Sequence, residues 1–488
     1  MRRRPDPTLR RGSTMILVLW TIGLTTLFVV SLQMSAFRQA AAGREALGRV
    51  RAKWAARAGI ESVIAYLAWD TQNTTKADPV QLRNALEDRA IDELALSREA
   101  LPLATFEIRH SDFNGDRIDG PLDTHTKFNI NLVTQEMLLA MDLDGMNPEI
   151  ANGILDWIDM DSEVRDGGAE EGYYLQASSP YSPRNGLIRT LEELDLVRDV
   201  DPEWVRGEDW NLNNALDPNE SDDDLTWPED NGDGYLDAGW SAYLTAMSRE
   251  SGYSMASGEP RIDLVTAEPN EIQERLQVNA NQAAALQAWA QGAGAKLGDL
   301  ITLQLSQIGP DGQPVANQQG QPTSGETGGG RLGGGGGFGG SGSGGAGGAG
   351  AAQPTLGASD LTDEQLRIVL EEAVIGPPEG IRAGKLNVNT ASRELLEYLP
   401  GIEPEVADQI EFTRQSLPHG YESLLDLLQV RGIDRELLVE LSTYVDVRSH
   451  VYQITSRGVG LPGRTEVELV VTIDRSALPI RILEYFER

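Results

Sequence analysis

An uncharged run near the start of the chain constrains the fold more than any other feature. The run extends over 26 residues from Gly12 to Phe37. A helix of that length, at about 1.5 Å per residue, crosses a hydrocarbon core of about 30 Å. Because basic flanks stay on the cytoplasmic side, we expect a membrane span from Thr14 to Phe37 with everything after Arg38 outside the cytoplasm. The basic flank consists of Arg2, Arg3, Arg4, Arg10 and Arg11.

A cleavable secretory signal is the alternative interpretation of this run. Ala40, Ala41 and Ala42 offer a small-residue cleavage site. The apolar stretch is longer than the apolar region of a usual signal, which favours a permanent anchor.

The composition shows an acidic excess and no cysteine. Lys and Arg number 41 against 75 Asp and Glu, a formal charge of −34. The missing cysteines exclude disulfides, thiolate metal sites and a cysteine nucleophile. The charge argues against partners such as nucleic acid or anionic lipid, and divalent cations are its natural counter-charge.

Apolar residues continue beyond the uncharged run at steps of mostly three and four. This stripe predicts one amphipathic helix that continues to about Asp70. The stripe would either simply pack on its own domain, or its outer half would pack on the domain while the apolar half of the helix packs against neighbouring subunits. The stripe consists of Leu47, Val50, Trp54, Ile60, Val63, Ile64 and Leu67.

The junction of Arg11-Gly12 with the apolar run resembles the class III leader of type IV pilin-like proteins. In that family a prepilin peptidase cuts after the glycine, which implies a mature chain beginning at Ser13. The family usually has a glutamate at the fifth mature position, where this chain has Leu17. That carboxylate pairs with the preceding subunit, so its absence implies a filament tip, as in the K-type minor pseudopilins of type II secretion.

The chain contains an internal duplication. Residues 127–131 and 136–138 match residues 385–389 and 394–396 at an offset of 258, the difference between 127 and 385. Residues 148–151 then match 404–407, and 190–194 match 423–427. A third trace, residues 261–267, resembles 385–391 but lacks the later segments.

The second copy resembles a helix-hairpin-helix module, with short helices joined by tight turns. DNA-binding members use glycine-rich hairpins to bring backbone amides to phosphates. Here the hairpins read Gly401-Ile402-Glu403 and Gly432-Ile433-Asp434, and residues 385–446 hold 5 Lys and Arg against 12 Asp and Glu. Nonspecific DNA binding depends on cationic side chains, so this charge opposes it. A membrane-anchored helix-hairpin-helix DNA receptor of competence remains the alternative, because it shares the anchor and the linker.

An insertion inside the first copy resembles the K-type minor pseudopilins, which carry the same signatures in the same order. The segments are Trp157-Ile158-Asp159-Met160-Asp161, Gly168-Ala169-Glu170-Glu171-Gly172-Tyr173-Tyr174, Tyr181-Ser182-Pro183-Arg184-Asn185 and Leu191-Glu192-Glu193-Leu194.

Four carboxylates of this insertion form the candidate calcium site. Asp159, Asp161, Glu170 and Glu171 provide hard oxygen ligands, of which calcium accepts six to eight in loose geometry. The resemblance implies calcium in this region as a structural cofactor. The alternative is a solvated acidic loop.

A second acidic run covers residues 217–237. Asp230, Asn231, Asp233 and Asp237 place oxygens at spacings resembling an EF-hand loop. The twelfth position is Trp240, where a bidentate glutamate belongs, so the run predicts an incomplete calcium loop or an acidic linker.

The remaining segments complete an α+β architecture. Residues 309–360 are rich in glycine and predict a flexible tether between domains. Alternating residues predict antiparallel strands over 104–110, 451–458, 464–473 and 480–486. We therefore expect an N-terminal transmembrane and stalk helix, a pilin-like antiparallel sheet packed on it, and a large inserted helical domain with duplicated helix-hairpin-helix (SAM-like) modules.

The expected division of the chain has eight parts. They are leader 1–12, transmembrane and stalk helix 13–70, start of the pilin-like domain 71–126, first helical module with the acidic metal-loop insertion 127–204, acidic loop and helical insertion 205–308, tether 309–360, second helical module 361–447 and C-terminal strands 448–488.

The predicted function is assembly, not catalysis. His110, His125, His419 and His450 lack the spacing of a zinc protease, and no Ser or Lys nucleophile stands in a recognised motif. The resemblance implies a minor pseudopilin at the tip of the pseudopilus, which initiates it together with I-type and J-type minor pseudopilins and other type II secretion components. It also implies a single-pass protein of the bacterial inner membrane with its C-terminal region in the periplasm.

Overall fold

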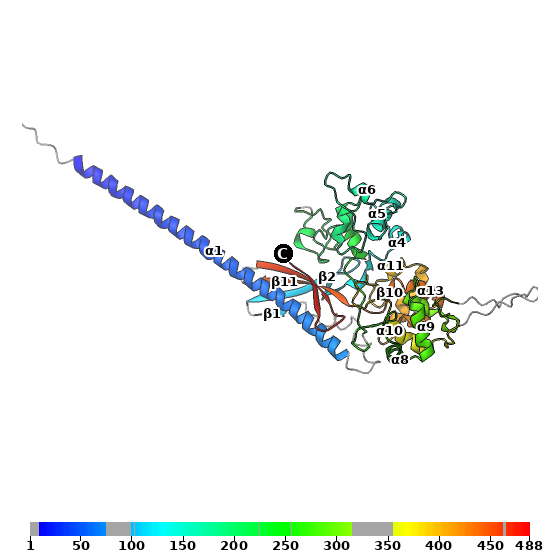
Figure 1. The fold of residues 1–488 in the computed structure, drawn as a ribbon. Helices are drawn as coiled ribbons and strands as arrows, with labels where there is room; N and C mark the ends of the chain where they lie inside the picture. The colour runs from blue at the N-terminus through cyan, green and yellow to red at the C-terminus, as the bar shows by residue number, and fades with distance from the viewer. Residues whose placement is uncertain are drawn as a thin grey trace, which may run out of the picture.

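Figure 1 shows a long helix, a sheet packed along the far half of that helix, and a group of short helices beyond the sheet. This computed structural model describes residues 9–74, 99–101, 103–223, 225–254, 256–314, 355–461 and 465–488. Two hydrophobic cores hold the described residues together, one between helix and sheet and one shared by the helical modules.

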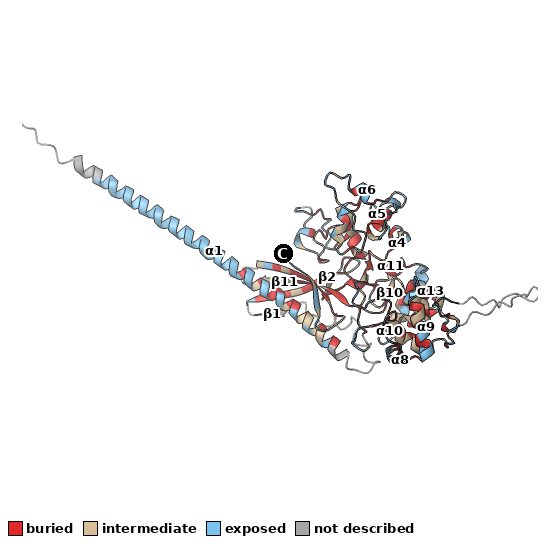
Figure 2. Ribbon diagram, in the orientation of Figure 1, coloured by how far each residue is buried: buried red, intermediate tan, exposed pale blue. Residues whose placement is uncertain are grey.

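The first helix, α1 (Leu9–Thr74), is one continuous helix of 66 residues. Its residues from 14 to 47 are all exposed, and the burial begins where the sheet meets it (Figure 2). Among the described residues it is the one helix apolar and long enough to cross a membrane, with a mean hydropathy of 2.3 in a window of which nothing is buried. The predicted continuous helix is confirmed, and it ends four residues beyond the expected Asp70.

The sheet is antiparallel throughout, and its strand order is β1-β2-β11-β12-β13. The four strands expected from alternation are confirmed. In the sequence, β1 to β4 come before the helical modules and β11 to β13 come after them. Two short strands complete the sheet, β3 on β2 and β4 on β11. The bounds are β1 (Glu99–Leu101), β2 (Ala104–Ser111), β3 (Arg117–Asp119), β4 (Leu122–Asp123), β11 (Val451–Gly460), β12 (Thr465–Asp474) and β13 (Arg481–Glu487).

The contact between α1 and the sheet corrects part of the predicted stripe. Ile60, Val63 and Leu67 are buried against the sheet as expected. Leu47, Val50 and Trp54 are 49%, 52% and 61% exposed and point away from it. The buried face of this stretch consists of small residues, because β11 crosses the helix too closely for larger side chains. These residues are Gly48, Ala52, Ala55 and Ala56.

Gly458 of β11 sets this close approach, and its replacement provides a test. A Cβ atom on Gly458 would lie 2.0 Å from the carbonyl oxygen of Ala52 and 2.6 Å from the amide nitrogen of Ala56. Backbone cannot yield as a flexible side chain does, so Gly458→Ala should lower the free energy of unfolding by about 1–3 kcal/mol, as overpacking does. The matched control is Gly43→Ala, whose Cβ meets nothing within 4 Å. Denaturant unfolding of the full chain in detergent measures both variants. An unchanged midpoint for Gly458→Ala would contradict the packing described.

The duplication is visible in the hydrogen bonds of the first and last helical modules. Asn131 donates to the carbonyl of Ile188 at 2.9 Å and accepts from its amide at 2.7 Å. Asn389 makes the same pair of bonds with Tyr421, at 2.9 and 2.8 Å. The two copies therefore share one local structure. The first contains β5 (Phe128–Asn129), α4 (Gln135–Ala140), α5 (Pro148–Ile158), η2 (Leu191–Leu196), α7 (Pro202–Arg206) and β6 (Leu244–Thr245), and the last contains β9 (Leu386–Asn387), α11 (Arg393–Leu396), α12 (Pro404–Ser416), η7 (Leu424–Gln429), α13 (Arg435–Leu441) and β10 (Val445–Asp446).

A complete third module lies between these two and corrects the expectation that its trace lacks the rest. Asp263 Oδ1 accepts the amide of Val265 at 3.0 Å, as Asn387 Oδ1 accepts that of Asn389 at 2.9 Å. The first and last strands of the module pair in parallel, as in the other two copies. The module contains β7 (Ile262–Asp263), α8 (Pro269–Leu276), α9 (Ala280–Ala290), η5 (Leu297–Ile301), α10 (Asp363–Glu372) and β8 (Ala373–Val374).

The third module also changes the interpretation of the glycine-rich segment. Its described ends meet, since the amide of Leu356 donates to the carbonyl of Ile308 at 3.0 Å. The segment therefore leaves and re-enters one module and does not connect two domains. Consequently α10 and β8, expected within the last module at 361–447, belong to the third. Residues 315–354 of the predicted tether lie outside the described residues.

Candidate functional site: an acidic loop on the first module

The acidic insertion begins where α5 ends and turns back at α6 (Glu171–Tyr174). Asp159 caps the C-terminus of α5, and Glu170 directly precedes α6. One carboxylate oxygen from each of Asp159, Asp161 and Glu170 lies within 4.8 Å of the others. The structure thus brings together three of the four predicted calcium ligands.

Glu171 stands apart from this group. It is exposed, and its Oε1 accepts a hydrogen bond from the Ser182 hydroxyl at 3.2 Å. Adjacent positions at a helix start point in different directions, so the Glu170-Glu171 pair divides between the inside and the surface.

Glu170 is the most buried carboxylate of this group. Its side chain is 4% exposed, and neither carboxylate oxygen has a partner with hydrogen-bond geometry. Burial raises the pKa of Glu170, the charges of Asp156 and Asp159 raise it further, and the amide of Glu171 opposes them. A buried carboxylate without compensation is costly, and calcium is a counter-charge that fits an all-oxygen group.

Asn185 belongs to the same loop and was missing from the predicted ligands. Its φ of 45° is left-handed, a conformation that asparagine tolerates better than most residues. Its amide donates to the carbonyl of Asp161 at 2.9 Å, while its Oδ1 is buried without a partner. The only sequence signal for Asn185 was its place at the end of the segment Tyr181-Ser182-Pro183-Arg184-Asn185.

Arg165 and a group of aromatic rings hold the loop in shape. Arg165 Nη1 lies 2.8 Å from Asp156 Oδ1 and also pairs with Asp159. The rings of Trp157 and Tyr174 meet edge to face with centroids 5.1 Å apart, and Tyr181 lies 5.2 Å from Tyr174. Trp157, Tyr174 and Tyr181 therefore pack together beneath the acidic group.

The second predicted calcium loop is organised differently. Its side-chain oxygens accept backbone amides of the loop itself: Asp230 from Gly232, Asn231 from Asp233, Asp233 from Tyr235 and Asp237 from Gly239, at 2.8 to 3.1 Å. In the part of the chain that the structure describes, these four do not form a group with metal-ligand spacing. The geometry favours the acidic linker over a calcium loop.

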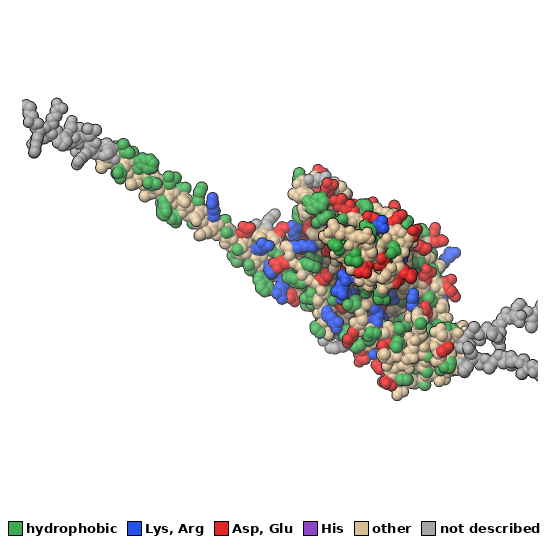
Figure 3. All heavy atoms as spheres, turned by 45° about the horizontal axis from the view of Figure 1, so that its top comes forward, with side chains coloured by type: hydrophobic (Ala, Val, Ile, Leu, Met, Phe, Trp, Pro, Cys, Tyr) green, Lys and Arg blue, Asp and Glu red, His purple; other side chains and the backbone are tan. Residues whose placement is uncertain are grey.

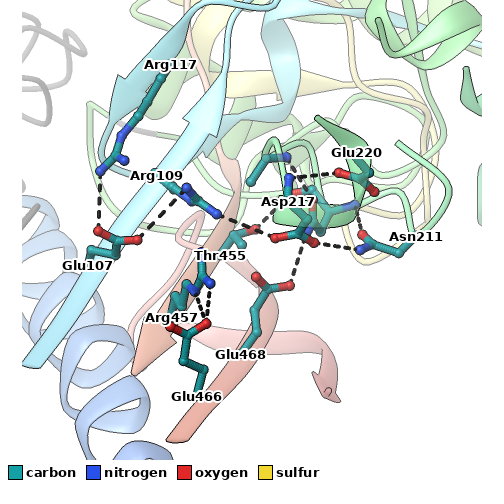
Figure 4. Close-up of polar contacts among 12 residues, drawn as sticks. Glu107, Arg109, Arg117, Asn211, Asp217, Glu220, Thr455, Arg457, Glu466 and Glu468 are labelled. Atoms are coloured by element: carbon teal, nitrogen blue, oxygen red, sulfur yellow. Dashed lines mark hydrogen bonds and ion pairs between the residues drawn. The ribbon is translucent and has the colours of Figure 1, made fainter. Parts of the chain in front are cut away.

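The start of this acidic run docks on the outer face of the sheet (Figure 4). Arg109 Nη2 lies 3.4 Å from Asp217 Oδ1, and Asn213 donates to Glu468 Oε1 at 2.8 Å. Burial raises the pKa of Glu220 to about 9, with Asp209 as the next cause. This network fixes the first module to the sheet.

The hairpins of the last module bear on the DNA alternative. Gly401 and Gly432 have φ values of 72° and 106°, which glycine adopts freely. Asp434 caps α13 by accepting the amide of Leu437 at 2.9 Å. The Asp434 carboxylate therefore already binds a backbone amide at the start of α13. In a DNA-binding hairpin, such an amide would be available to bind a phosphate. Figure 3 shows many acidic side chains on the visible face of the modules.

Comparison with known proteins finds a family match over the part of the chain that contains the acidic loop. Residues 123–207 match the family of type II secretion system protein K, over the first module and its acidic insertion. The match shows a similarity to protein K of type II secretion over this part of the chain. Residues 382–446 match the helix-hairpin-helix motif, as predicted for the last copy. A crystal structure of the GspK-GspI-GspJ complex from enterotoxigenic Escherichia coli is similar at 12% identity and a TM-score of 0.37, covering 88% of this chain and 98% of that one. No curated protein matches by sequence.

Proposed function

We propose that this chain is a K-type minor pseudopilin that occupies the tip of a type II secretion pseudopilus and initiates it together with I-type and J-type minor pseudopilins. The match of residues 123–207 to protein K carries this proposal, because it covers the segment in which three carboxylates converge. The chain acts as a scaffold in the bacterial inner membrane, with its modules in the periplasm and without catalysis of its own.

The long exposed half of α1 supports the assembly role. Residues 14–37 form the membrane anchor, and residues 38–47 continue the same exposed helix toward the sheet. Leu47, Val50 and Trp54 extend its apolar surface alongside the domain. Leu17 lacks the carboxylate that would contact a preceding subunit, which agrees with a position at the tip.

Calcium serves as a structural cofactor in this proposal. Asp159, Asp161 and Glu170 supply carboxylate ligands, and the orphaned Oδ1 of Asn185 adds a neutral oxygen. The cation closes the turn between α5 and α6, while Glu171 stays at the surface.

The DNA receptor remains the second candidate, because the anchor and the helix-hairpin-helix match are common to both. One preparation distinguishes them. The full chain in detergent should copurify with I-type and J-type minor pseudopilins coexpressed from a type II secretion system, and should not retard duplex DNA at near-physiological salt. Absence of copurification would contradict the assembly role. Micromolar, salt-sensitive DNA binding lost on change of the Gly401 and Gly432 hairpins would establish the receptor instead.

A further inference from the structure

A cavity of about 640 Å³ lies between the third and the last helical modules. Its size is that of a small-molecule site. Its lining contains seven Lys and Arg and six Asp and Glu, a near balance in a chain whose formal charge is −34.

Three of the lining carboxylates are already paired. Glu250 meets Lys385 at 2.9 Å and Glu372 meets Arg275 at 2.6 Å, while Glu371 pairs with Arg448. Arg261 and Arg382 line the same cavity. Burial raises the pKa of Glu250, but the charges of Lys385, Arg261 and Arg382 lower it below its usual value, so three cations act on one carboxylate at this end of the cavity.

The repeat provides an internal comparison for Arg261. Each module begins with a cation directly before its first strand: Lys127, Arg261 and Lys385. Lys127 is buried, donates to the Ser241 carbonyl at 2.7 Å and faces the charge of Asp209, while Lys385 has Glu250. Arg261 has a buried Nε without a hydrogen-bond partner.

His450 adds a second orphaned group to the cavity wall. Its side chain is 3% exposed and its Nδ1 has no hydrogen-bond partner. The rings of His450 and His125 lie edge to face with their centroids 5.9 Å apart, although the two residues are far apart in the sequence. Burial lowers the pKa of His450 well below its usual value, and the charges of His125, Arg261, Arg448 and Arg475 lower it further. A neutral imidazole in a positive surrounding faces the cavity.

We propose that this cavity binds a small oxyanion, a carboxylate or a tetrahedral anion, on Arg261 and Arg382 with His450 as a hydrogen-bond partner. Guanidinium groups bind such anions through paired charge-assisted hydrogen bonds. The bound anion would bridge the two modules, because Arg261 starts the third module and Arg382 and His450 flank the last.

Calorimetric titration of the full chain in detergent with succinate and with sulfate, at constant ionic strength and with chloride as the reference anion, tests the proposal. Succinate represents a carboxylate ligand and is preferred to citrate, which would also bind calcium. We expect saturable binding of at least one of the two and a matching rise of the melting temperature. Arg261→Gln and Arg382→Gln should each weaken the binding by about tenfold or more, the loss of a charge-assisted contact.

Arg431→Gln is the matched control, since Arg431 is an exposed cation of the last module outside the cavity lining. It should bind as the wild type does. Binding of succinate alone assigns the site to carboxylates, and binding of sulfate alone to tetrahedral anions. Absence of saturable binding for both, or equal binding by Arg261→Gln and the control, overturns the proposal.

Discussion

Gly12→Val is expected to leave the chain uncut by a coexpressed prepilin peptidase, whereas the wild type should lose twelve residues and begin at Ser13. Gly12 lies at the border of the basic flank and the apolar run, within the backbone of α1. A β-branched side chain at the cleaved bond adds bulk where glycine presents only backbone. Mass spectrometry of the mature amino terminus measures the result, together with secretion by the host system.

Gly23→Val is the matched control for this substitution. Gly23 lies in the same apolar run, and a Cβ atom there meets nothing within 4 Å. This variant should be processed normally. A chain cut near Gly43, or an uncut Gly12→Val chain that supports unimpaired secretion, would sink the pseudopilin proposal.

The sheet and the stalk helix could be predicted because their patterns are local. Alternation along 451–458 and 464–473 marks half-buried strands, and a long uncharged run permits only a helix at a membrane. The exposure of Trp54 could not be predicted, since it depends on how closely Gly458 approaches Ala52 across about 400 residues of chain. Apolar spacing identifies a stripe but not which neighbour covers it.

The third module escaped prediction because its sequence replaces the residues that define the others. Asp263 keeps the bond to the amide two residues on, but Val265 stands where the other copies have an asparagine. The glycine-rich segment then separates η5 from α10, which hides the remaining helices of the module. Hydrogen bonding preserves the local structure after the sequence signal has faded.

The candidate calcium site was likewise predicted only in part from the sequence. The quoted segments predicted that Asp159, Asp161 and Glu170 act together, and the structure brings them within 4.8 Å. The separation of Glu171 and the entry of Asn185 depend on side-chain direction, which a segment match does not contain. The anion cavity had no sequence signal, because Arg261, Arg382 and His450 come from three separate segments.

Calcium should raise the stability of the chain, and the double variant Asp159→Ala, Asp161→Ala should lose most of that gain. An ion bound only by the folded state adds RT ln(1 + [L]/Kd), about 2.7 kcal/mol at a hundredfold excess over Kd. Magnesium should substitute poorly, because it holds its water and demands a tighter octahedron. The matched control, Asp233→Ala with Asp237→Ala, should lose less, since those carboxylates already accept amides of their own loop. Identical melting midpoints in chelator, calcium and magnesium would leave a solvated acidic loop.

The pH dependence of the same melts gives a second readout of Glu170. Without calcium its pKa is raised in the folded state, so the folded chain binds the proton more tightly than the unfolded chain does. The contribution of this group to stability should then fall as pH rises from the unfolded pKa through the raised folded value. Bound calcium holds the carboxylate ionised and should remove this fall. The difference between chelator and calcium should therefore widen from acid to neutral pH in the wild type, and a gap independent of pH would exclude Glu170 as a ligand.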